Sequence, residues 1–144
     1  MNKNIVLVSG GFDPIHSGHI KLIKEASKYG EVVVLLNSDN WLREKKGKEF
    51  MPFEERNVIM KYLKNVIDVI SFNDSDKTCI DGIKIASTKY KGRKIIFANG
   101  GDRNSSSTPE KKYCDEKKIE TIWGIGGNTK SNSSSWILKK WNEK

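Results

Sequence analysis

The two histidines of this chain lie close together in one segment. His16 and His19 are its only imidazoles, and residues 10–19 read Gly-Gly-Phe-Asp-Pro-Ile-His-Ser-Gly-His. An apolar run, Ile-Val-Leu-Val at residues 5–8, precedes this segment, and apolar residues at helical spacing follow it. Backbone N–H groups at a helix N-terminus attract anions, and imidazoles can donate hydrogen bonds to phosphate oxygens. The segment therefore predicts a binding site for a polyphosphate.

Two other polar segments contain adjacent glycines and follow apolar runs later in the chain. Residues 99–103 read Asn-Gly-Gly-Asp-Arg, and residues 126–135 read Gly-Gly-Asn-Thr-Lys-Ser-Asn-Ser-Ser-Ser. Adjacent glycines let a backbone approach a ligand closely. A serine at a helix start is an ordinary cap, but three in a row beside a glycine-rich segment favour phosphate binding. We therefore expect both segments to share a ligand with the histidines.

The pattern of apolar residues predicts the elements that must position these segments. Short runs rich in Val and Ile predict strands at residues 5–9, 31–37, 66–72, 94–98 and 120–124. Helices are expected at residues 18–29, 53–65, 78–90, 109–117 and 134–142. Strict alternation predicts an α/β fold, a single doubly wound, Rossmann-like domain over residues 1–144 with a five-stranded parallel sheet in the order 3-2-1-4-5. The three polar segments then meet at the carboxyl ends of the strands, where such sheets bind ligands.

Length, charge and cysteine content exclude several classes of protein. The chain has 144 residues, a net charge of +8 and no apolar run near the ~20 residues that cross a membrane. A strand is expected from residue 5, so we expect no signal peptide, and Cys79 and Cys114 lack metal or redox spacing. Both are expected to be free thiols in a reducing cytoplasm. The 26 basic residues are scattered without interleaved aromatics, which favours a solvated surface or a small polyanionic substrate over nucleic acid.

The histidine segment resembles the H-x-G-H signature of the cytidylyltransferase-like nucleotidyltransferases, which include glycerol-3-phosphate cytidylyltransferases and heptose-phosphate adenylyltransferases. It contains neither the P-loop pattern nor the G-x-G-x-x-G fingerprint. The resemblance implies that His16 and His19 contact the nucleotide phosphates and stabilise the transition state. It also implies that the residues around them bind the nucleotide, namely Ser9, Gly10, Gly11, Phe12 and Gly18.

Later segments are similar to further elements of that family. Residues 99–103 resemble the Gly-Gly-Asp element after the fourth strand, which implies that Gly101 and Asp102 hold the nucleotide, while Arg103 is expected beside the acceptor. The serine run resembles the hydroxyl-rich element that binds the leaving phosphates, with a basic residue before it. This implies those roles for Ser133, Ser134, Ser135 and Lys130. Asp13 is expected to orient its loop, or to lie near a metal or the acceptor.

The resemblance also implies a lysine that reaches the triphosphate or the acceptor phosphate. A lysine is a mobile point charge, whereas an arginine offers a fixed fork for one phosphate. Lys45 and Lys48 match the family when counted back from Arg56, but Lys46 matches when counted from the Lys-Gly pair, so all three stay candidates. We expect them on a mobile polar loop before the helix that opens at Pro52, with Arg56 as a phosphate ligand.

The expected reaction joins a nucleoside triphosphate to a phosphorylated small alcohol or sugar and releases pyrophosphate. CTP is slightly favoured by the lysine spacing, and ATP with a heptose phosphate is the alternative favoured by residues 37–39 and 99–102. Mg²⁺ is expected to be held mainly by triphosphate oxygens and water, because the sequence contains no carboxylate cluster suited to a protein cage. A non-catalytic nucleotide-binding module is the alternative of another class, and a homodimer is left open as the oligomeric state.

Overall fold

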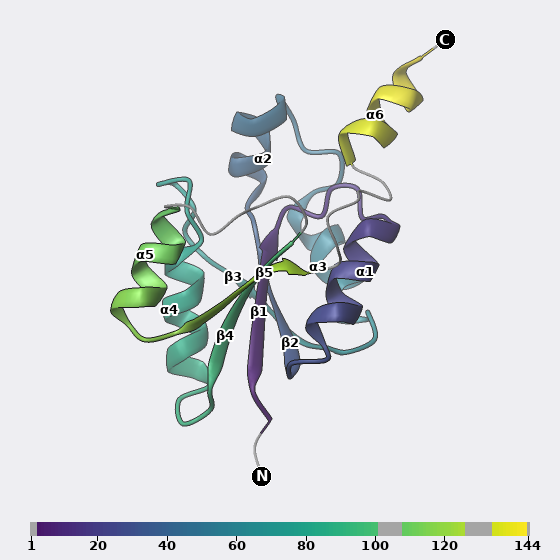
Figure 1. Ribbon diagram of the computed structural model, residues 1–144. Coiled ribbons are helices and arrows are strands. Elements are labelled where there is room, and N and C mark those ends of the chain that lie inside the picture. The colour runs from purple at the N-terminus through teal and green to yellow at the C-terminus, as the bar shows by residue number, and fades with distance from the viewer. Residues whose placement is uncertain (1–2, 101–107, 126–133, 144) are drawn as a thin grey trace.

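The computed structural model describes residues 3–100, 108–125 and 134–143 (Figure 1). Its strands are β1 (Ile5–Gly10), β2 (Glu31–Leu36), β3 (Val66–Ser71), β4 (Ile95–Gly100) and β5 (Glu120–Ile125). Its helices are α1 (Ser17–Ala26), α2 (Asp39–Lys46), α3 (Phe53–Lys61), α4 (Ile80–Lys89), α5 (Pro109–Glu116) and α6 (Ser134–Asn142). The strands are parallel and lie in the order β3-β2-β1-β4-β5, which confirms the predicted fold.

The two central strands explain why their sequences are continuous apolar runs. Strand β1 pairs with β2 along its whole length, from Ile5 beside Glu31 to Gly10 beside Leu36. Residues 5–8 and 32–36 are completely buried. A strand that is covered on both faces has no solvent side, so its apolar residues do not alternate with polar ones. The edge strand β3 is only partly buried.

Helices cover both faces of the sheet and create two apolar layers. On one face, Ile23 of α1 and Met60 of α3 pack against alternate residues of the central strands. On the other face, Ile83 of α4 and Cys114 of α5 pack against the remaining residues of those strands. The helix pairs α1/α3 and α4/α5 therefore lie on opposite sides of the sheet, as Figure 1 shows.

Helix α2 is absent from the elements that the sequence predicts, and the expectation that all three lysines lie on a loop is wrong. Ser38 caps this helix, because its Oγ accepts a hydrogen bond from the Trp41 N–H at 3.1 Å. The only apolar residues of this helix, Trp41 and Leu42, are adjacent, so its sequence shows no apolar repeat at helical spacing. Residues 45–46 form its last turn, and Gly47 follows with a φ of 95°.

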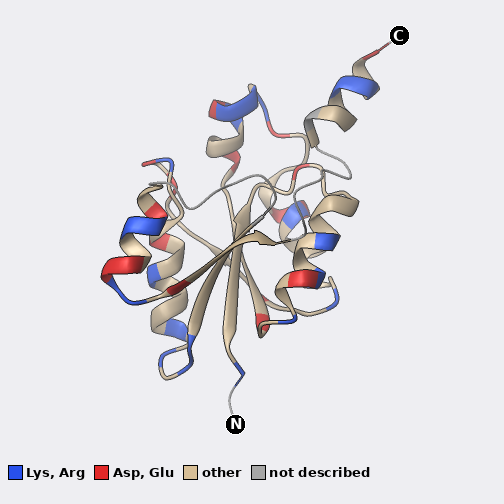
Figure 2. Ribbon diagram, viewed as in Figure 1, with Lys and Arg blue, Asp and Glu red and all other residues tan. Residues whose placement is uncertain are grey.

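The two helices that do not belong to the helical layers lie at the same end of the strands. Helices α2 and α6 lie beyond the carboxyl ends of the strands, whereas the beginning of β1 lies at the opposite edge (Figure 1). Charged residues are distributed over the elements rather than collected in one stripe (Figure 2). None of the helices in the described ranges is long and apolar enough to cross a membrane.

Candidate active site

A cavity of about 290 Å³ opens at the carboxyl ends of the strands. Its wall comes from the loop after β1, from α1 and α2, and from the segments that open α4, α5 and α6. The structure places many of the expected substrate-binding residues in this wall: Ser9, Gly10, Gly11, Phe12, Asp13, His19, Lys45, Lys46 and Ser134. Residues from distant parts of the sequence thus meet at one site, and their individual binding roles stay predictions.

The two histidines form one stacked unit at the start of α1. His16 is the N-cap residue, and its Nδ1 accepts a hydrogen bond from the Gly18 N–H at 3.0 Å. Nδ1 of His19 accepts a hydrogen bond from the His16 N–H at 3.2 Å, so both side chains cap the helix. The two ring centroids are 3.8 Å apart, and the Phe12 ring meets the His19 ring edge-on at 4.7 Å. The backbone of Gly18 therefore orients a histidine.

These contacts determine where each imidazole carries its proton. A ring nitrogen that accepts a hydrogen bond has no proton, so in each neutral ring the proton lies on Nε2. Burial lowers the pKa of His16. Burial also lowers the pKa of His19 to about 3, with smaller contributions from His16 and Lys45. Both imidazoles are therefore neutral at pH 7, and each offers one Nε2–H donor.

The three candidate lysines have different surroundings. Lys46 Nζ forms an ion pair of 3.0 Å with Asp13 Oδ2 and also donates to the Asp13 backbone carbonyl. Lys45 Nζ lies over the Trp41 ring, 4.7 Å from its centroid. Lys48 follows α2, is exposed, and is not part of the cavity wall. Because lysine side chains are flexible, Lys45 and Lys46 are the two that can reach a phosphate in the cavity.

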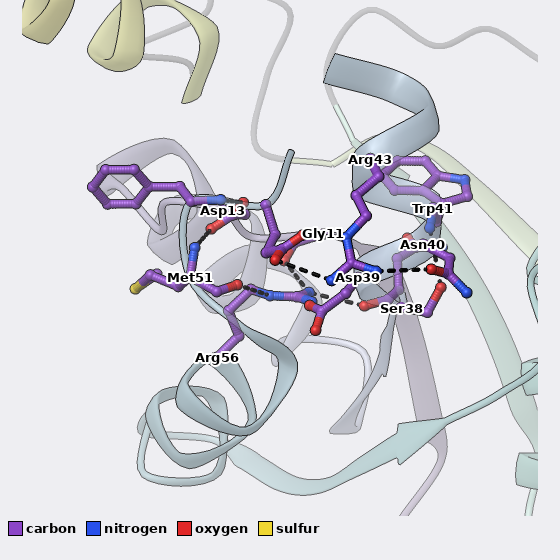
Figure 3. Close-up of polar contacts among 12 residues, drawn as sticks. Gly11, Asp13, Ser38, Asp39, Asn40, Trp41, Arg43, Met51 and Arg56 are labelled. Atoms are coloured by element: carbon purple, nitrogen blue, oxygen red, sulfur yellow. Dashed lines mark hydrogen bonds and ion pairs between the residues drawn. The ribbon is translucent and has the colours of Figure 1, made fainter. Parts of the chain in front are cut away.

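Arg56 contacts the protein itself, not the cavity. Its side chain is 1% exposed, and it donates to the carbonyl oxygens of Met51, Gly11 and Asn37 at 2.9, 3.0 and 2.8 Å. Its Nη2 pairs with Asp39 Oδ1 at 2.6 Å, and Figure 3 shows the side chain between Gly11, Met51 and Asp39. Four of its five N–H groups are thereby used. The expected role as a phosphate ligand does not fit this geometry, in which Arg56 joins the loops that surround the cavity.

Asp13 holds the segment before α3 in place. The residue is 2% exposed, and its Oδ2 and Oδ1 accept hydrogen bonds from the N–H groups of Phe50 and Met51 at 2.6 and 2.7 Å (Figure 3). The ion pair with Lys46 also uses Oδ2. This arrangement agrees with the expectation that Asp13 orients the loop. The expected position of Asp13 near the acceptor phosphate stays a prediction.

The carboxylates of the site do not make a metal cage. Within the described ranges, no group of three or more His, Cys, Asp or Glu side chains could hold a metal ion. Both oxygens of Asp13, the carboxylate nearest to the histidines in sequence, already accept backbone hydrogen bonds. The expectation that triphosphate oxygens and water hold Mg²⁺ stays a prediction.

A buried acid that no motif marks holds the segment after β2 in place. Asp74 is 6% exposed, and its Oδ2 accepts hydrogen bonds from Asn37 Nδ2 at 3.0 Å and from the Ser38 N–H at 2.8 Å. Its Oδ1 accepts from Ser38 Oγ at 2.6 Å. These contacts connect the cap of α2 to the segment after β3. No local signal marks Asp74, because its partners lie 36 and 37 positions away.

One flank of the cavity carries no motif in the sequence. Lys77, Thr78 and Cys79 at the start of α4 line it together with Glu110 of α5. Glu110 Oε2 accepts a hydrogen bond from the Cys79 N–H at 3.1 Å, which joins the beginnings of the two helices. The predicted topology is the one feature of the sequence that could have indicated this flank, because the segment after β3 also lies at the carboxyl end of a strand.

Several expected residues lie outside the described residues. These are Gly101, Asp102, Arg103, Lys130 and Ser133, and the side chain of Ser135 is likewise not described. Ser134 is described, and its Oγ donates a hydrogen bond to the Pro14 carbonyl at 2.8 Å. This contact brings the start of α6 against the histidine loop, as the expected shared site requires.

Comparisons with known proteins show the family of this chain. The chain matches the family described as cytidylyltransferase-like over residues 7–142. It is 30% identical to the bifunctional protein HldE of Aliarcobacter butzleri over 148 residues, which cover 100% of this chain and 28% of that protein. It is 32% identical to the bifunctional protein HldE of Enterobacter sp. strain 638 over 113 residues, which cover 69% of this chain and 24% of that protein. The chain thus spans at most 28% of the length of these two curated relatives.

A solved structure shares the fold. The lipopolysaccharide core biosynthesis protein of Thermoplasma volcanium matches with a TM-score of 0.66 and 23% identity, over 90% of this chain and 98% of that one. The family match covers the histidine segment, α2 and the start of α6, which are the elements that surround the cavity. The chain therefore belongs to the cytidylyltransferase-like family of nucleotidyltransferases.

Proposed function

We propose that this protein transfers an adenylyl group from ATP to a phosphorylated sugar and releases pyrophosphate. Family membership supports the reaction class. The relatives named bifunctional protein HldE, together with the resemblance of residues 37–39 and 99–102 to heptose-phosphate adenylyltransferases, favour ATP and a heptose phosphate over CTP. The lysine spacing that favours CTP is counted from Arg56, whose side chain is held within the protein.

The observation that carries this proposal is the stacked histidine pair. Both Nδ1 atoms accept backbone hydrogen bonds, so Nε2–H is the donor left on each ring. Rings fixed in this way need no reorganisation to donate to phosphate oxygens that gain charge during the reaction. Because both rings are neutral, they provide hydrogen bonds, while Lys45 and Lys46 provide the positive charge.

The reaction is a single displacement at phosphorus. An oxygen of the acceptor phosphate attacks the α-phosphorus of the triphosphate, and the bond from that phosphorus to the oxygen bridging to the β-phosphorus breaks. The acceptor phosphate is already an anion at neutral pH, so no general base is needed. Catalysis then depends on positioning and on stabilisation of charge by His16, His19 and the lysines of α2. We propose that Mg²⁺, bound through the triphosphate oxygens, supplies further positive charge.

Pyrophosphate release tests the proposal. The protein is incubated with ATP or CTP and Mg²⁺, and with heptose 1-phosphate or glycerol 3-phosphate as acceptor. We expect release with ATP and heptose 1-phosphate to exceed the three other combinations. Release with CTP and glycerol 3-phosphate instead would favour the cytidylyltransferase alternative. Stabilisation by ATP without release in any combination would favour a non-catalytic nucleotide-binding module.

A further inference from the structure

The cavity wall contains one carboxylate that is only partly used by the protein. Two described residues of the wall are acidic, Asp13 and Glu110. Both oxygens of Asp13 accept backbone hydrogen bonds. Glu110 Oε2 accepts one hydrogen bond, from the Cys79 N–H, and no residue of the described ranges donates to its Oε1. Oε1 of Glu110 is therefore an acceptor that a ligand in the cavity can use.

Glu110 lies on the flank of the cavity opposite the histidines. His19 comes from α1, which covers one face of the sheet, whereas Glu110 comes from α5, which covers the other. The cations Lys45 and Lys46 belong to α2, which lies beyond the carboxyl ends of the strands (Figure 1). Lys77 is also present on the Glu110 flank, but it is exposed and forms no ion pair with that carboxylate within the described ranges.

This difference between the flanks selects the chemistry of the group that each can bind. Phosphate is attracted by His19 and the α2 lysines, and the charge of Asp13 on that flank is balanced by its ion pair with Lys46. Glu110 forms no ion pair within the described ranges, so its carboxylate repels phosphate. A carboxylate accepts strong hydrogen bonds from hydroxyl groups, because the acceptor is charged. The part of the ligand beside Glu110 must therefore carry hydroxyl donors, while its phosphate lies towards the histidines.

We propose that Glu110 is a specificity-determining residue that binds hydroxyl groups of the acceptor. This inference rests on the proposed function, because it assumes that a phosphorylated acceptor enters the cavity. The ribose of the nucleotide offers similar hydroxyls. The acceptor is favoured because Glu110 belongs to the helix that follows residues 103–108, the segment expected to meet the acceptor. Acceptors that carry a carboxylate or an alkyl chain at this position are disfavoured.

Kinetics of Glu110→Gln, with Glu116→Gln as the control, test the role of the charge. The amide oxygen of glutamine can still accept the Cys79 hydrogen bond, so the folded structure and the melting temperature should be preserved. Glu116 lies on the same helix, is exposed and is outside the cavity wall. We expect Glu110→Gln to raise KM for heptose 1-phosphate about tenfold or more, with KM for ATP within about twofold of the wild type. Glu116→Gln should change neither value.

Calorimetry measures acceptor binding without turnover, so it tests the role of Glu110 separately from the proposed reaction. Heptose 1-phosphate and glycerol 3-phosphate are titrated into the protein saturated with a non-hydrolysable ATP analogue. Binding by the wild type that Glu110→Gln weakens supports the inference even where no turnover occurs. The inference is overturned if the wild type and Glu110→Gln bind the acceptor equally well, or if the wild type binds neither heptose 1-phosphate nor glycerol 3-phosphate. A rise in KM for ATP instead of the acceptor also overturns it, because Glu110 would then bind the ribose.

Discussion

The backbone N–H of His16 donates a hydrogen bond to Nδ1 of His19, and the two imidazole rings stack with their centroids 3.8 Å apart. The same two side chains therefore cap α1 and present the donors proposed to act on phosphate. A substitution of either histidine removes both properties unless the new residue can still cap the helix.

Substitution of His16 by asparagine separates these properties. Asparagine is a good N-cap residue, so His16→Asn should keep the melting temperature close to that of the wild type. It lacks the Nε2–H donor at the position of the imidazole, so kcat for pyrophosphate release should fall ~10²-fold or more, with a smaller change in KM. His16→Ala should lose both stability and activity. A His16→Asn enzyme with wild-type kcat would contradict the proposed role.

The low pKa of His19 predicts that stability falls in acid. The unfolded chain binds a proton at the ordinary histidine pKa of 6.5, whereas the folded protein binds it only near pH 3. Between these values the unfolded state holds more protons, so the free energy of unfolding should fall as pH decreases, by at most ~1.4 kcal/mol per pH unit from this residue. Urea unfolding at pH 7, 6 and 5 measures it. His19→Gln should show a shallower decline, and parallel curves for the two proteins would refute the assignment.

Arg56 should be important for folding. Replacement by methionine fills much of the space but leaves the carbonyl oxygens of Gly11, Asn37 and Met51 without their donor. Buried acceptors that lose their partners are costly, so we expect Arg56→Met to lower the free energy of unfolding by ~3 kcal/mol or more. Lys61→Met on the same helix is exposed and serves as the control. Urea denaturation compares the two, and similar values for both variants would show that the contacts of Arg56 matter little.

The lysines should differ in their effect on turnover. Lys46 lines the cavity and Lys48 does not, so Lys46→Ala should lower kcat/KM about tenfold or more, whereas Lys48→Ala should leave it nearly unchanged. Lys46→Ala also removes the partner of Asp13, so its melting temperature is measured alongside. A folded Lys46→Ala protein with full activity, or a strong defect in Lys48→Ala, would reverse this ranking.

The fold could be predicted because its determinants are local. The apolar runs of β1 and β2 and the regular alternation with helices suffice to indicate a doubly wound parallel sheet. Helix α2 could not be predicted in this way, because its only apolar residues are adjacent and its start depends on the Ser38 cap. That cap is in turn held by Asp74, which lies 36 positions away.

The sequence indicates those residues of the site that are contiguous in the chain. It does not indicate those whose role depends on tertiary contacts. Residues 9–13, His19 and Ser134 lie in the cavity wall as expected, whereas His16 and Gly18 do not line it. A guanidinium suits phosphate, so the sequence favours a ligand role for Arg56, but carbonyl oxygens from three separate segments satisfy the same donors. Glu110 carries no motif, and only its hydrogen bond to Cys79 and its place in the cavity wall distinguish it from other acids at helix starts.

The direction of β1 also determines how this protein can be attached to other molecules. Residue 3 precedes β1 at the edge of the sheet opposite the cavity, whereas α6 begins at the cavity wall with Ser134 (Figure 1). A surface or fusion partner joined at the amino end should leave the cavity open to substrates. Helix α6 has nine residues and is therefore about 14 Å long, at a rise of 1.5 Å per residue. A partner joined to its end through a short linker would lie that close to the cavity and would hinder the entry of substrates. Amino-terminal immobilisation is therefore the better geometry for assays on a solid support.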